Sequence, residues 1–100
     1  MSAAVAYEEE ELQAKIRVAP PKLIGARIKR ARKALDQTLD VFAAAIGTNR
    51  SHIIKLEKGD HRPQVRTLIK IASHTGRDPI WFLDPEVDPS PFPDDREPDA

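Results

Sequence analysis

The sequence predicts an all-α domain of five helices over residues 22–84. Three observations favour this class. Apolar residues recur at intervals of three and four, glycines follow the ends of these apolar stripes, and no strand-like alternation competes in this range. The chain has 100 residues, the size of one domain.

The first two helices follow from their apolar stripes and end signals. Four apolar residues share one sector of a helical wheel over residues 22–35: Ile24, Ile28, Ala31 and Leu35. A second stripe follows Thr38, a residue suited to the N-cap, and consists of Leu39, Phe42, Ala43 and Ile46. Gly47 then suits a left-handed C-terminal cap, so the second helix is short.

Three further helices are predicted in the same way. Asn49 can cap a helix over residues 50–58, whose buried stripe is Ile53 and Leu56 and which Gly59 ends. A fourth helix runs from Val65 to Gly76. Asp78-Pro79 is a cap followed by a first-turn proline, and it opens a last short helix that contains Trp81, an expected core residue.

The two ends of the chain differ from this middle. Residues 1–21 form an N-terminal extension, in which residues 7–18 fit a helical stripe and a strand alternation equally, until Pro20-Pro21 stops either element. Five of the nine prolines lie among acidic residues in 85–100, which predicts a disordered tail.

The formal net charge of zero conceals a segregation of charge. Residues 21–77 carry thirteen basic and four acidic side chains, a net charge of +9, whereas residues 78–100 carry one basic and eight acidic side chains, a net charge of −7. A basic middle segment favours a polyanionic partner.

Composition excludes several other classes. The chain has no Cys, so disulfide scaffolds and thiol sites are excluded. No apolar run approaches the ~20 residues of a membrane span, and no signal-peptide pattern opens the chain. We therefore expect a cytoplasmic protein, in bacteria or in the host of a phage.

The outward face of the helix at 50–58 is the candidate binding surface. Opposite Ile53 and Leu56 lie three cations, a hydroxyl and an isoleucine: Arg50, Lys55, Lys58, Ser51 and Ile54. Arginine can bond guanine O6 and N7 together, an aliphatic group can touch a thymine methyl, and lysines neutralise phosphates. The pattern predicts a helix that enters a DNA major groove. A solvated basic face is the alternative.

The sequence resembles the lambda-repressor-like (Cro or xenobiotic-response-element type) family of helix-turn-helix DNA-binding domains. The resemblance covers about residues 23–83. The matching stretches are IGARIKRARK, TLDVFAAAIGTNRSHIIKLEKG, the Arg-Pro pair at 62–63, and TLIKIASHTGRDPIWFL.

The resemblance implies a five-helix domain that binds operator DNA, usually as a homodimer, with residues 50–58 as the recognition helix. Carried over by position, the base-contacting residues are Arg50, Ser51 and Lys55, with Ile54 beside them. The phosphate-contacting residues are Thr38, Asn49, Lys58 and Arg62. The chain departs from the family at Leu39, often Gln, at Asp36-Gln37, often Gly-Leu, and at Thr48, more often aliphatic.

Arg32 and Glu57 match family positions that form an ion pair between the first helix and the recognition helix. Such a pair would fix the angle of the recognition helix. The dimer interface is expected at the last helix, with Phe82 and Leu83 partly exposed, or at the segment 12–18.

The sequence therefore predicts a sequence-specific transcriptional regulator, a Cro-like repressor of the phage or bacterial type that acts by occupying its operator. It predicts no enzyme, cofactor or metal site, because His52, His61 and His74 lack metal-ligand spacing and no catalytic motif is present. Two alternatives stay open: an antitoxin whose terminal segment wraps a toxin, and a protein-interaction module that uses residues 12–18 and 80–83. The acidic tail either competes with DNA for the basic surface or only aids solubility.

Overall fold

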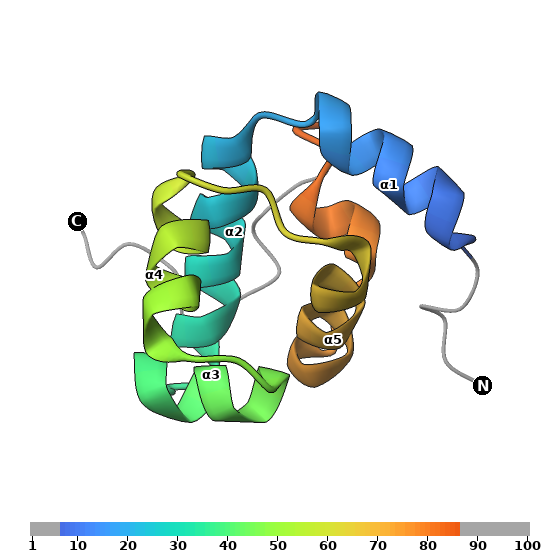
Figure 1. Ribbon diagram of the computed structural model, residues 1–100. Coiled ribbons are helices and arrows are strands. Elements are labelled where there is room, and N and C mark those ends of the chain that lie inside the picture. Colours follow the sequence, from blue (N-terminus) through green and yellow to red (C-terminus); the bar gives the residue numbers. More distant parts are fainter. Residues whose placement is uncertain (1–6, 87–100) are drawn as a thin grey trace.

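The structure, a computed structural model, describes residues 7–86 and contains helices and turns with no strand among these residues (Figure 1). The helices are α1 (Glu9–Val18), α2 (Pro21–Ala34), α3 (Leu39–Ile46), α4 (Arg50–Lys58) and α5 (Val65–Thr75), followed by the 3-10 helix η2 (Pro79–Phe82). The predicted all-α class is confirmed. Residues 1–6 of the expected N-terminal extension, and all but the first two residues of the expected tail at 85–100, lie outside the described residues.

The predicted helix ends agree with the structure because the capping residues act as expected. The Thr38 side chain accepts a hydrogen bond from the Val41 amide, and the Asn49 side chain accepts one from the His52 amide. Gly47 and Gly59 take left-handed conformations at φ 88° and 82°, which close α3 and α4. The last predicted helix is a single 3-10 turn.

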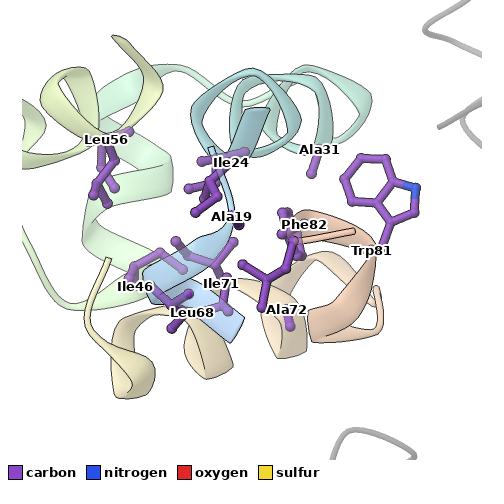
Figure 2. Packing of buried hydrophobic residues seen from close by; sticks show 14 of the residues in the cluster. Ala19, Ile24, Ala31, Ile46, Leu56, Leu68, Ile71, Ala72, Trp81 and Phe82 are labelled. Atoms are coloured by element: carbon purple, nitrogen blue, oxygen red, sulfur yellow. The ribbon is translucent and has the colours of Figure 1, made fainter. Parts of the chain in front are cut away.

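Residues 7–18, whose sequence fits a helix and a strand equally, form helix α1 from Glu9 onward and contribute side chains to the core. In α1, Leu12 is 0% exposed and Ile16 is 4% exposed, and the helix packs against α5. The folded unit therefore includes α1 as well as the predicted domain at 22–84. Figure 2 shows Ala19, which follows α1, among the buried residues of α2, α5 and η2.

Helices α2 and α4 make the most extensive helix–helix contact of the fold. Gly25 lies at this contact, and a Cβ atom there would overlap the backbone carbonyl oxygens of Leu56 and Glu57. Glycine is therefore required for the two backbones to approach this closely. The position of α4 relative to α2 is set by backbone contact.

A buried arginine fastens the end of the domain to α2. The Arg27 guanidinium donates to the carbonyl oxygens of Trp81 and Asp84, the second at 2.7 Å, and lies 5.4 Å from the centre of the Trp81 ring. Burial lowers the pKa of Arg27, while the carboxylate of Asp84 opposes that change. The predicted core position of Trp81 agrees with its 4% exposure.

Candidate nucleic-acid interface

Helix α4 presents a buried face and a charged face, as its sequence predicts. Ile53 and Leu56 point into the core, whereas the polar and cationic side chains of the opposite face are exposed: Arg50, Ser51, Lys55 and Lys58. Ile54, the isoleucine expected on this outward face, is half-buried. Only part of its side chain is left to contact a ligand.

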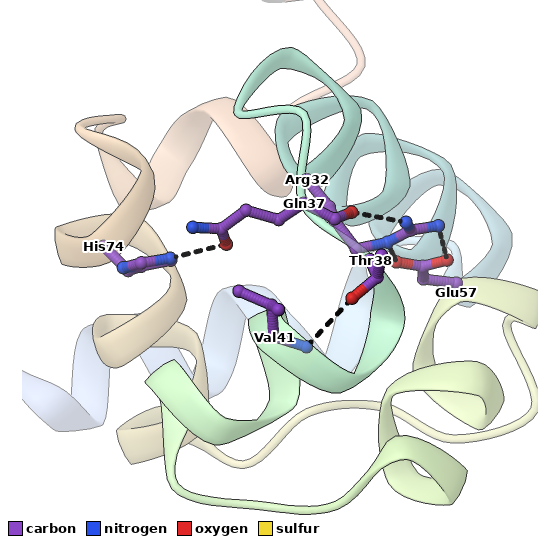
Figure 3. Close-up of polar contacts among 6 residues, drawn as sticks. All are labelled: Arg32, Gln37, Thr38, Val41, Glu57 and His74. Atoms are coloured by element: carbon purple, nitrogen blue, oxygen red, sulfur yellow. Dashed lines mark hydrogen bonds and ion pairs between the residues drawn. The ribbon is translucent and has the colours of Figure 1, made fainter.

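The N-termini of α3 and α4 carry the two capping residues that were expected to contact phosphates. The hydroxyl oxygen of Thr38 accepts from the Val41 amide at 3.2 Å, and the side-chain oxygen of Asn49 accepts from the His52 amide at 2.9 Å (Figure 3 draws the first of these). Capping uses acceptor oxygens. The Thr38 hydroxyl proton and the Asn49 amide group therefore remain chemically suited to donate to an anion.

Arg32 and Glu57, which the sequence places together, join α2 to α4 by two hydrogen bonds (Figure 3). The Arg32 Nε and Glu57 Oε2 atoms are 2.7 Å apart, and a second bond of 3.1 Å joins Arg32 Nη2 to Glu57 Oε1. Arg32 also donates to the Gln37 carbonyl oxygen at 2.9 Å, which ties the turn before α3 to the same guanidinium. Both charged side chains are largely buried, at 11% and 8% exposure. A planar guanidinium held on two sides restrains α2, α3 and α4 together.

The turn between α3 and α4 contains a contact that the sequence did not indicate. Thr48 Oγ1 and His52 Nδ1 are 2.9 Å apart. Thr48 occupies a position that is more often aliphatic in the family that the chain resembles, and here its hydroxyl group has a polar partner in the first turn of α4. A comparable contact of 2.9 Å joins His74 Nε2 to the Gln37 side chain (Figure 3). Polar side-chain contacts thus support both ends of α3.

Arg50, the first expected base-contacting residue, lies next to an acidic residue of α3. Its Nη1 atom is 3.5 Å from Asp40 Oδ2, and the two side chains are 59% and 70% exposed. Sequence reasoning did not identify Asp40 as part of this surface. An acidic residue two positions after a threonine N-cap is a common helix-start feature and carried no separate signal.

Arg62, an expected phosphate-contacting residue, makes intramolecular bonds that the sequence did not predict. Its Nε donates to the Ile16 carbonyl oxygen at 3.0 Å, and its Nη2 donates to the Ala19 carbonyl oxygen at 3.2 Å. Arg62 therefore binds backbone groups at the C-terminal end of α1. The third guanidinium nitrogen, Nη1, takes part in neither bond.

The expectation that Phe82 and Leu83 are partly exposed at a dimer interface is wrong. The structure buries both, at 0% and 4% exposure, and Phe82 packs edge-on against Trp81 with ring centres 5.0 Å apart. The core needs these rings, because the domain has few aromatic residues with which to close the end between α2 and α5. Neither side chain is available to a partner.

Most of the large apolar side chains in the two segments expected of a protein-interaction module are internal. Within residues 12–18, Leu12 and Ile16 face the core, and within 80–83 only Ile80 is more than slightly exposed. Among the large apolar residues of segment 12–18, Val18 is the exception, at 80% exposure. The terminal segments that an antitoxin would use lie mostly outside the described residues.

Residues 7–86 offer neither a metal site nor a membrane span. No group of three or more His, Cys, Asp or Glu side chains is arranged to hold a metal ion in this range. None of the helices described there is long and apolar enough to cross a membrane.

Comparison with known proteins agrees with this geometry. The family model described as Helix-turn-helix, of the lambda-repressor-like type, matches residues 28–82, which is more than half of the chain. The matched range begins within α2 and covers α3, α4, α5 and η2, and α1 lies before it. No curated protein and no solved structure matches the chain.

Proposed function

The chain belongs to the lambda-repressor-like helix-turn-helix family of DNA-binding domains, and on this premise we propose that it is a sequence-specific transcriptional repressor that occupies operator DNA. The observation that carries the proposal is the contrast between the two faces of α4. One face is fixed in the core by Ile53 and Leu56, and the other presents exposed cations. Proteins of this family are typically non-enzymatic, and occupancy requires no catalysis.

In the proposed complex, α4 lies in the major groove. An α-helix with its side chains is about 10–12 Å across, which matches the ~12 Å width of the groove in B-DNA. Arg50 donates to O6 and N7 of a guanine, while Ser51 and Lys55 contact neighbouring base edges and the exposed part of Ile54 contacts a thymine methyl. Base contacts of this kind carry sequence information.

The phosphate contacts fix the position of α4 along the groove. Lys58 and Arg62 supply charge, while the Thr38 hydroxyl and the Asn49 amide supply donors at the starts of α3 and α4. Because Arg62 is engaged by two carbonyl oxygens of α1, its phosphate contact uses Nη1 or an exchange of partners. The rigid α2–α4 contact holds these groups in register with the base contacts.

The repressor acts as a homodimer of the phage or bacterial type in this proposal. One helix-turn-helix reads only half of an operator, and two copies reach half-sites about 34 Å apart on one side of the duplex. Phe82 and Leu83 are not part of the interface, because both are buried within one copy.

The proposal is tested by selecting duplexes from a random pool and measuring the affinity of variants. Arg50→Ala should weaken binding by ~1–3 kcal/mol and relax preference at one base position. Lys58→Ala should weaken all duplexes alike and reduce the slope of log K against log salt by about 1. Lys15→Ala, on the exposed side of α1, is the matched control and should leave the base preference unchanged.

Two results would contradict the proposal. The first is a chain that binds no duplex in dilute buffer, as expected of an interaction module. The second is an Arg50→Ala variant with the base preference of Lys15→Ala.

A further inference from the structure

We propose that Asp40 is a positioning residue for Arg50, and that it raises the selectivity of the protein for its operator over other DNA. The inference rests on the proposed function and concerns one side chain that the DNA-binding assignment leaves without a role. Asp40 lies in the first turn of α3 and Arg50 in the first turn of α4, so their contact crosses the two helices of the motif.

The position of Asp40 is unusual among the acidic residues of the basic segment. Residues 21–77 contain four acidic residues: Asp36, Asp40, Glu57 and Asp60. Glu57 is bonded to Arg32 on the buried side of α4, whereas Asp40 lies within 3.5 Å of the cation with the strongest expected preference for guanine. A carboxylate at a DNA-facing surface repels phosphates, so its presence lowers affinity for every duplex.

The contact leaves Arg50 able to read a base. A guanidinium has five donor hydrogens in a fixed plane, and the closest approach of Asp40 to it is the 3.5 Å contact between Oδ2 and Nη1. A carboxylate at that side restricts the rotation of the long side chain and leaves Nε and Nη2 for the acceptors of guanine. Less rotamer entropy is then lost when the bidentate contact forms.

The same contact disfavours other DNA. Without a guanine in place, Arg50 gains only charge attraction to a nearby phosphate, and it must give up part of its contact with Asp40 to make it. At 59% and 70% exposure the ion pair is weak, and exposed pairs of this kind contribute about 0.2–1 kcal/mol. That range corresponds to an effect on selectivity of about 1.4- to 5-fold.

A structural role for Asp40 predicts a different result. An acidic side chain in the first turn of a helix interacts favourably with the helix dipole. If that were its only role, Asp40→Asn would lower the melting temperature and leave the ratio of specific to non-specific affinity unchanged.

The test is a double-mutant cycle on the full chain. Asp40→Asn, Asp40→Glu and Asp36→Asn are made with Arg50 present and with Arg50→Ala. Asp36 is the matched control because it is an exposed acidic residue at the α2–α3 turn, and Asn tolerates its positive φ of 58°. The dissociation constant is measured for the selected duplex and for a random duplex of equal length at one salt concentration.

With Arg50 present, Asp40→Asn should tighten binding to the random duplex about 1.4- to 5-fold more than binding to the selected duplex, so the affinity ratio falls by that factor. Asp40→Glu should restore most of the ratio because it restores the carboxylate. In the Arg50→Ala background, Asp40→Asn should change both affinities equally. Asp36→Asn should change both equally in either background.

The proposal is overturned if Asp40→Asn leaves the ratio unchanged, or if the ratio falls equally with and without Arg50. Either result leaves the proposed function intact, since wild-type binding is unaffected. A wild-type chain that binds no duplex removes the proposed function itself, so the two failures are distinguishable.

Discussion

Helices α4 and α1 are attached to the domain in different ways. At the α2–α4 contact, Gly25 lets two backbones touch, and Arg32 and Glu57 form a largely buried ion pair. Helix α1 instead inserts apolar side chains and receives two hydrogen bonds from the exposed residue Arg62. Backbone contact allows little adjustment, whereas side-chain contacts can repack. The helix that we propose enters the DNA groove thus has the less adjustable attachment.

Breaking the α2–α4 contact should have the largest effect. Gly25→Ala places a Cβ atom against two carbonyl oxygens, and neither backbone can yield without moving a helix, so we expect a loss of about 3 kcal/mol or more in unfolding free energy. Gly76→Ala is the control, because its added Cβ atom meets no atom within 4 Å. The only expected loss is the cost of an alanine in the left-handed conformation, about 1–2 kcal/mol. Urea denaturation compares the two, and an equal loss would show that the backbone contact is not restrictive.

Breaking the α1 attachment should have a smaller and more local effect. Leu12→Ala removes a fully buried side chain, for which about 2–3 kcal/mol is expected, since the loss is limited by the free energy with which α1 docks. Amide hydrogen exchange should show lost protection in α1 and retained protection in α2 and α4. Gln13→Ala, on the exposed side of α1, is the control. Equal loss of protection in all helices would mean that α1 unfolds only with the whole domain.

The ion pair should give the smallest of the three changes, and it sharpens the comparison. Glu57→Gln removes the charge that faces a largely buried guanidinium, so we expect a loss of about 1–2 kcal/mol. Lys58→Gln changes the next residue, which is exposed, and should alter stability by less than about 0.5 kcal/mol. Equal melting temperatures for the two variants would indicate that backbone contact alone sets the position of α4.

The sequence was sufficient for the features that depend on local chemistry. Thr38, Asn49, Gly47 and Gly59 mark the ends of α3 and α4 because caps act within a few residues, and the two faces of α4 follow from helical periodicity. The partnership of Arg32 and Glu57 came from the family resemblance. No local pattern at either residue indicates it.

The features that the sequence did not predict depend on how distant elements meet. Helix α1 is stabilised by core contacts and by hydrogen bonds from Arg62, which lies more than forty residues away from its acceptors. Phe82 and Leu83 belong to a run of four apolar residues, and such a run has no polar face that would show which side is buried. The contact of Asp40 with Arg50 depends on the rotation of α3 relative to α4, which neither helix encodes alone.

The bonds from Arg62 to α1 affect how a minimal version of this protein should be made. A truncation that starts at residue 28, where the family match begins, would remove both carbonyl acceptors of Arg62 together with the buried side chains of α1 and Gly25 itself. The shortened chain would lose the bonds that hold the loop after α4. Affinities measured on such a fragment would describe a different molecule, so boundaries for expression should be placed before Glu9.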